Sequence, residues 1–164
     1  MKLYYIPVIS FYIFTFLKQF YILPSGSIGI GDMFLAASGV FLIIQTICSR
    51  KRFFYKIDIP WYVFIIAVCI INGFYYCYNQ NGQFLLFTLY WMYVTMAIWI
   101  FRTLASEQFL FGLGIVCQIN LLVQTIIYFL GKGRYFHENW GGSRFMGTFN
   151  DPNQFAFFIF TMLL

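Results

Sequence analysis

The stretch IPWYVFIIAVCIINGFYYCY, from Ile59 to Tyr78, decides the fold because it contains no charged residue. About 20 consecutive, mainly apolar residues cross a hydrocarbon core of about 30 Å as a helix. A helix is favoured there because it satisfies its own backbone hydrogen bonds where no water is present. The stretch therefore predicts a transmembrane helix.

Segments on both sides of this stretch repeat its length and composition, with short polar or glycine-containing links between them. Four of them are long enough to span a membrane: Leu3–Leu23, Ile30–Ser49, Gln83–Phe101 and Gln108–Leu130. A sixth segment, Pro152–Leu164, has thirteen residues, or roughly 20 Å of helix, which is too short. We expect an all-α, polytopic transmembrane bundle, with five spans and the start of a sixth, in a single membrane domain over residues 1–164.

The short sixth segment also predicts that the chain is the N-terminal portion of a longer protein. A carboxylate at the end of Leu164 would otherwise lie at mid-membrane depth, where a charge is costly. The composition agrees with a membrane protein, since 62% of the residues are hydrophobic and only 9% are charged. Soluble chains carry roughly a quarter charged residues. The net charge of +5 is modest, so nucleic acid is not an expected partner.

The lysines and arginines predict the orientation, because loops kept in the cytoplasm are enriched in both. A cytoplasmic N-terminus places most of them inside: Lys2, Arg50, Lys51, Arg52, Lys56 and Arg102. The longest loop, residues 131–151, then faces outward. It carries Lys132, Arg134 and Arg144 against the rule. The rule describes a bias in numbers, so the positions of Lys132 and Arg134 are explained as well by chance as by ligand binding. The setting of Arg144, by contrast, favours a functional role.

That setting is the sequence RFMGTFNDPNQ, from Arg144 to Gln154, which reads as a loop entering a helix. Asp151 is expected to cap the helix and Pro152 to occupy its first position. A guanidinium beside a helix N-terminus suits an anion, and Gly147 permits a tight turn near it. Asn153 would bind either a sugar or the loop itself.

These residues resemble the motif of the O-antigen ligase and polysaccharide polymerase superfamily (Wzy and WaaL type): Arg-x-x-Gly, an aromatic residue, Asn or Asp, then Pro-Asn. The matching positions are Arg144, Gly147, Phe149, Pro152 and Asn153. The segment from Pro24 to Asp32 resembles the first outer loop of the family. The resemblance covers the order of the spans and about a tenth of the chain in residue detail. The second half of the family's chain, with an outer loop supplying further arginine and histidine groups, has no counterpart in this sequence.

The resemblance implies glycosyl transfer at the outer face of a bacterial cytoplasmic membrane, in a multi-pass protein, with a glycan on undecaprenyl diphosphate as the donor and no metal or other cofactor. Arg144 would stabilise the diphosphate as the catalytic group, and the remaining motif residues and cations would bind the substrate: Gly147, Pro152, Asn153, Lys132 and Arg134. Membrane lipid and other polysaccharide-export proteins are the expected partners.

Polymerisation of repeat units into a capsular or other surface polysaccharide is the leading interpretation, and three alternatives for the chain stay open, as do the roles of some residues. The chain could be a ligase of the same superfamily, a transporter or flippase of lipid-linked sugars, or an inactive fragment. His137 and Glu138 are either a solvated pair or an acid and a base. Asp32 suits a helix cap better than a catalytic acid, and Lys18 is expected to extend to the interface.

The cysteines predict no metal site or disulfide. They lie singly in or at the ends of apolar runs, at Cys48, Cys69, Cys77 and Cys117, and the chain has one histidine. Metal sites need clustered ligands. Buried free thiols are expected instead.

Overall fold

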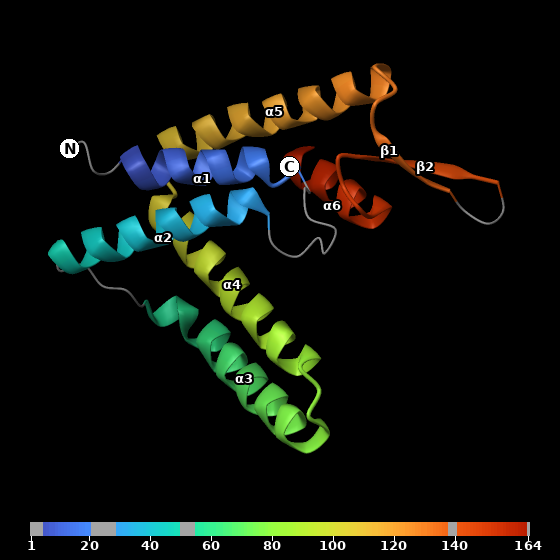
Figure 1. The fold of residues 1–164 in the computed structure, drawn as a ribbon. Helices are drawn as coiled ribbons and strands as arrows, with labels where there is room; N and C mark the ends of the chain where they lie inside the picture. Colours follow the sequence, from blue (N-terminus) through green and yellow to red (C-terminus); the bar gives the residue numbers. More distant parts are fainter. Residues whose placement is uncertain (1–4, 21–28, 50–54, 138–140, 164) are drawn as a thin grey trace. The chain divides into compact units, whose positions relative to one another are not determined.

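The computed structural model describes residues 5–20, 29–49, 55–137 and 141–163. These contain six α-helices, a short 3-10 helix (Lys56–Asp58) and a two-stranded sheet (Figure 1). In chain order the main elements are α1 (Tyr5–Leu17), α2 (Ile30–Cys48), α3 (Ile59–Asn79), α4 (Gln83–Leu104), α5 (Glu107–Phe129), β1 (Arg134–His137), β2 (Ser143–Gly147) and α6 (Pro152–Leu163). The chain forms two compact units, the first from residues 1–38 and 104–164, the second from residues 39–103.

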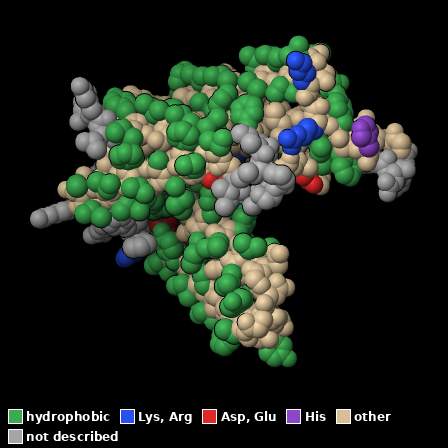
Figure 2. All heavy atoms as spheres, in the orientation of Figure 1, with side chains coloured by type: hydrophobic (Ala, Val, Ile, Leu, Met, Phe, Trp, Pro, Cys, Tyr) green, Lys and Arg blue, Asp and Glu red, His purple; other side chains and the backbone are tan. Residues whose placement is uncertain are grey.

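Four helices in the described part of the chain, α2 to α5, are long and apolar enough to cross a membrane. They contain 19, 21, 22 and 23 residues, which fits a hydrocarbon core of about 30 Å. Figure 2 shows mainly hydrophobic side chains on the face that it draws, with few charges among them. A surface of this kind suits lipid, and the chain is a helical membrane protein.

The first predicted span is not confirmed. Helix α1 has 13 residues, or about 20 Å at 1.5 Å per residue. It ends at Leu17, and Lys18 and Gln19 form a turn; residues 3–4 and 21–23 of the predicted span lie outside the described residues. Gln19 is fully buried and bonded to other buried amides, which gives the chain a reason to leave the helix there. The count of five spans, the cytoplasmic N-terminus and the single membrane domain stay predictions.

The second unit contains α3 and α4 as an antiparallel pair (Figure 1). Hydrogen bonds join them at two levels: the Trp61 indole donates to the Thr95 hydroxyl at 3.1 Å, and the Asn72 amide donates to the Thr88 hydroxyl at 3.1 Å. Lipid tails are as apolar as the side chains, so apolar contact alone gives little preference for another helix over lipid. The polar pairs therefore hold this helical hairpin together.

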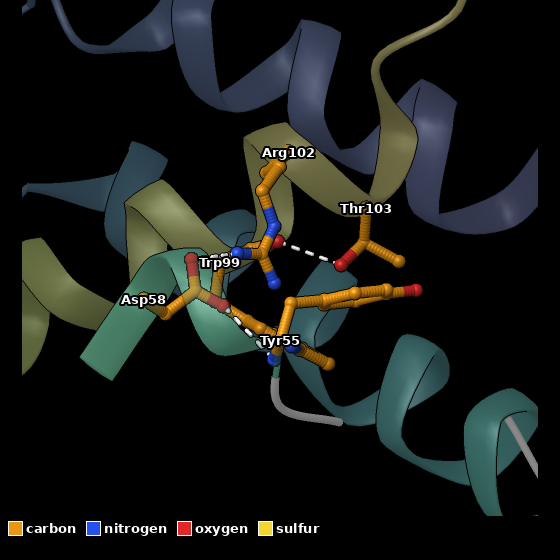
Figure 3. Close-up of polar contacts among 5 residues, drawn as sticks. All are labelled: Tyr55, Asp58, Trp99, Arg102 and Thr103. Carbon is orange, nitrogen blue, oxygen red and sulfur yellow. Dashed lines mark hydrogen bonds and ion pairs between the residues drawn. The ribbon is translucent and has the colours of Figure 1, made fainter. Parts of the chain in front are cut away.

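An ion pair also joins α3 and α4, at the end of the helical hairpin that lies away from their connecting turn (Figure 3). The Arg102 guanidinium donates to the Asp58 carboxylate and lies 4.8 Å from the centre of the Tyr55 ring. Asp58 also accepts the Tyr55 backbone N–H at 3.2 Å. Asp58 precedes α3 and Arg102 lies in the last turn of α4, so each charge also complements its helix dipole.

The first unit packs α1 against α5. The Tyr12 ring stacks on the Phe109 ring, with centres 5.5 Å apart and an angle of 14° between the planes, and its hydroxyl donates to the Phe109 carbonyl at 2.8 Å. A Cβ at Gly112 would lie 2.3 Å from the Tyr12 hydroxyl oxygen. Glycine at this position therefore lets α1 approach α5 closely.

Residues 131–151, predicted as a loop, contain an antiparallel hairpin of β1 and β2. The Phe145 ring anchors it, because it lies edge-on to Tyr128 of α5 at 5.1 Å and to Phe155 of α6 at 5.3 Å, measured between ring centres. It also covers Gly133, where a Cβ would lie 2.1 Å from the ring. The strands were missed in the sequence because each is short and depends on these distant rings.

Replacing Thr88 or Thr95 by valine should weaken the pairing of α3 with α4, because it leaves an N–H donor on α3 without its acceptor. The expected loss is about 0.6 kcal/mol each and at most about 1.7 kcal/mol, measured as the free energy of unfolding in mixed detergent. Thr103→Val is the matched control, since the Thr103 hydroxyl bonds to Trp99 of its own helix (Figure 3). Equal losses in all three variants would contradict this account.

Candidate functional site

The hairpin of β1 and β2 determines the face on which the Arg144 side chain lies. In the strand pairing Arg144 lies directly opposite Phe136, and paired residues share a face of the ribbon. Phe145, the next residue, therefore points to the other face, where its ring packs on α5 and α6. Arg144 and Phe136 are both exposed, so the hairpin presents a cation and an aromatic ring side by side.

Helix α6 begins as the sequence predicts. The Asp151 carboxylate accepts the backbone N–H groups of Asn153 at 2.7 Å and Gln154 at 3.1 Å, and Pro152 occupies the first turn. This cap has a consequence for anion binding. Because Asp151 takes these N–H groups and adds a negative charge, an anion here would be bound by side chains such as Arg144, more than by the helix N-terminus.

A groove of about 500 Å³ lies beside these residues, between β2 and α6. Its polar end consists of Arg144 and Asn153, with Pro152 next to them. The rest of its lining is apolar and consists of Phe145 of β2 and, along α6, Phe155, Ala156, Ile159, Phe160 and Leu163. The groove thus combines a cation and an amide at one end with an apolar surface along one helix.

The structure brings three of the six predicted site residues to this groove: Arg144, Pro152 and Asn153. Arg134 donates a hydrogen bond to the Asn150 side chain, which holds it on the loop before α6. Lys132 is exposed just beyond α5. Neither of these two cations lines the groove.

Gly147 has a structural reason to be glycine. Its φ is +60°, a conformation that L side chains rarely adopt. It is buried, and a Cβ there would lie 2.1 Å from Oε1 of Gln124. The residue was predicted to bind substrate, but its position against α5 indicates that glycine is needed here for the conformation of the turn.

Three functional candidates were missed in the sequence: Gln19, Asn120 and Gln124, which are 0%, 0% and 2% exposed. Two of them contact the Thr148 hydroxyl, which accepts from Nε2 of Gln124 at 2.9 Å and donates to the Gln19 carbonyl; Asn120 joins them by accepting from Nε2 of Gln19 at 3.0 Å. The spacing of two of these amides in the sequence could have indicated them. Asn120 and Gln124 are four residues apart in a predicted span, which places both amides on one helix face.

A second, smaller pocket of about 190 Å³ lies in the second unit, beside the Asp58–Arg102 pair. Its wall includes Trp61, Tyr62 and Trp99. The two charges bind each other (Figure 3), so the pocket presents little net charge to a ligand. We regard it as part of the helical hairpin's packing.

The weaker candidates have ordinary structural roles. Asp32, in the first turn of α2, accepts the Gly29 backbone N–H at 2.6 Å, as the third helical residue of a capping box does, and pairs with the Lys18 ammonium at 2.8 Å. Lys18 therefore binds a carboxylate. Its predicted position near the membrane interface stays a prediction. His137 is exposed at the end of β1, while its predicted partner Glu138 lies outside the described residues.

The cysteines are free thiols, and the prediction that they are buried is wrong. Cys48 and Cys77 are exposed and Cys69 and Cys117 are half-buried. Most of the surface of these spans is apolar and exposed, and a thiol is a small apolar group that such a surface accepts. Over the described ranges, no three histidine, cysteine or acidic side chains cluster as a metal site would require.

Comparisons of the chain with protein-family models, with curated proteins and with solved structures found no match in any of the three. The resemblance to the ligase and polymerase superfamily thus rests on the motif residues themselves.

Proposed function

We propose that the chain is the membrane part of a polysaccharide polymerase, which joins repeat units carried on undecaprenyl diphosphate at the outer face of a bacterial cytoplasmic membrane. The observation that carries this proposal is the groove in which Arg144 meets the apolar face of α6. A polyprenyl diphosphate is an anion attached to a long apolar chain. A site for it needs a cation and an apolar surface next to each other.

The role of Arg144 follows from the charge that develops during glycosyl transfer. The bond between the sugar's anomeric carbon and the phosphate oxygen breaks, and the electron pair leaves with the carrier diphosphate. A guanidinium can bind two phosphate oxygens at once through charge-assisted hydrogen bonds. Stabilising a charge that grows in the transition state lowers the barrier to the reaction.

The apolar wall of the groove would bind the polyprenyl chain of the carrier lipid. Its residues occur at positions 155, 156, 159, 160 and 163, the spacing that places side chains on one face of a helix. Phe160 and Leu163 are exposed, so this face offers contact area to a polyprenyl chain lying along α6. Asn153, at the polar end, supplies an amide for phosphate or the first sugar.

A ligase of the same superfamily uses the same donor and the same chemistry at the diphosphate. The groove serves either enzyme, because the two differ in the acceptor. Transport of lipid-linked sugars is the other candidate, and no feature of the groove favours it. We therefore keep polymerisation as the proposal, with the lipid-linked glycan as substrate and other polysaccharide-export proteins as partners.

Arg144→Lys should weaken binding of undecaprenyl diphosphate at least about tenfold, because an ammonium cannot reproduce the two-pronged contact and a hydrogen bond to a charged group contributes roughly 1.5–3 kcal/mol. Binding would be measured on the purified protein in lipid nanodiscs. Arg134→Lys is the matched control, since Arg134 is held by Asn150 away from the groove. Wild-type affinity in Arg144→Lys, or an equal loss in both variants, would refute the assignment.

The proposed orientation makes a separate prediction. In a variant without the native cysteines, Ser143→Cys should react with a membrane-impermeant thiol reagent in intact cells. Lys56→Cys, which is also exposed, should react only after lysis. The reverse pattern would place the groove on the cytoplasmic side, where the proposed acceptor and donor do not meet.

A further inference from the structure

Three buried amides in the first unit carry an inference beyond the groove. The side chains of Gln19, Asn120 and Gln124 are almost completely inaccessible. Burying an amide without a hydrogen bond costs roughly 1–3 kcal/mol in proteins, and in a lipid environment water cannot take the missing role. Such residues in a membrane helix are therefore expected to have a specific task.

Their hydrogen bonds join the end of α1 to α5. Nε2 of Gln19 donates to Oδ1 of Asn120 at 3.0 Å, and Nε2 of Gln124 donates to Oε1 of Gln19 at 2.9 Å. The amide of Asn120 also donates to the Thr15 carbonyl at 3.1 Å. The three amides thus form one chain of hydrogen bonds, which we call the amide bridge.

The bridge continues into the motif. Nε2 of Gln124 donates to the Thr148 hydroxyl at 2.9 Å, and that hydroxyl donates to the Gln19 carbonyl. Gly147 lies against Oε1 of Gln124 with no room for a side chain. The turn after β2 is therefore fixed on its inner side by Gln19 and Gln124.

Two anchors follow Arg144 in the chain. The first is the ring of Phe145, packed on α5 and α6, and the second is Thr148, bonded to the amide bridge. The bridge also has a local cost, since Oε1 of Gln124 is buried with no hydrogen-bond partner among the described residues. Costs of this kind concentrate at functional sites, and an apolar side chain at position 124 would avoid this one.

We propose that the amide bridge positions the turn Met146–Phe149 and thereby orients the Arg144 guanidinium toward the groove, with Gln124 as the principal positioning residue. The inference rests on the proposed function for the identity of the ligand. The position of the turn itself can be tested without any ligand.

The first test measures hydrogen exchange of the Phe149 amide, which donates to the Met146 carbonyl within this turn. Gln124→Leu should raise its exchange rate at least tenfold. Gln118→Leu is the matched control, because Gln118 is an exposed residue of the same helix, and it should leave the rate unchanged. An unchanged rate in Gln124→Leu overturns the proposal.

Variants at Thr148 keep the test informative if Gln124→Leu does not fold. Thr148→Val removes the hydroxyl and should raise the Phe149 exchange rate, whereas Thr148→Ser retains the hydroxyl and should restore the wild-type rate. Thr125→Val controls for loss of a hydroxyl elsewhere, since Thr125 is exposed and its hydroxyl donates to the Leu121 carbonyl of its own helix. The same rate in Thr148→Val and Thr148→Ser overturns the proposal.

The second test asks whether Gln124 acts through Arg144. Gln124→Leu should lower the affinity for undecaprenyl diphosphate roughly tenfold, and it should have no further effect in the Arg144→Ala background. An equal loss in both backgrounds overturns the positioning role. If Arg144→Ala alone leaves the affinity unchanged, the proposed function fails, and the exchange measurement still decides whether the bridge fixes the turn.

Discussion

The hydrogen bonds between the Gln124 amide and the Thr148 hydroxyl, and from that hydroxyl to the Gln19 carbonyl, are the contacts on which the candidate site depends. They connect the turn just beyond α1, helix α5 and the turn after β2, which are separate in the sequence. Apolar packing cannot fix this turn as specifically, because a hydroxyl and an amide bond in few geometries whereas apolar contacts tolerate small shifts. Because the turn is held in one position, Arg144 stays at the groove beside α6.

Both units follow the same physical rule by different means. In the second unit an indole and an amide of α3 meet two hydroxyls of α4; in the first, three amides meet at the junction of α1 and α5. Uncharged polar pairs suit a membrane because they give helices a specific partner without the cost of a buried charge. The charged pairs, Lys18 with Asp32 and Arg102 with Asp58, lie at or beyond helix ends.

The length of each apolar run predicted α2 to α5 with ends that differ by only a few residues from those of the structure, because a span's length is fixed by the thickness of the membrane. The start of α6 was also predictable, since the Asp151 cap and Pro152 act locally. The end of α1 was not predictable, because the burial of Gln19 depends on Asn120, which is distant in sequence. Composition alone does not distinguish a spanning helix from a short one packed against a neighbour.

The same distinction applies to the site. Arg144 stood out because of its local setting, a short loop before a capped helix start, and the role of Gly147 could only be seen once Gln124 was placed against it. The hairpin of β1 and β2 was missed because its anchor, Phe145, gains its meaning from rings on two other helices. Sequence reasoning singled out the motif, and the fold shows which distant residues contact it.

Nitrogen–phosphorus dipolar recoupling by solid-state NMR tests the central claim most directly. The protein would carry nitrogen-labelled arginine side chains and be reconstituted in bilayers with undecaprenyl diphosphate. The account predicts that one guanidinium signal is dephased by the diphosphate and that this effect disappears in Arg144→Lys. Dephasing that persists in Arg144→Lys, or none in the wild-type protein, would contradict it.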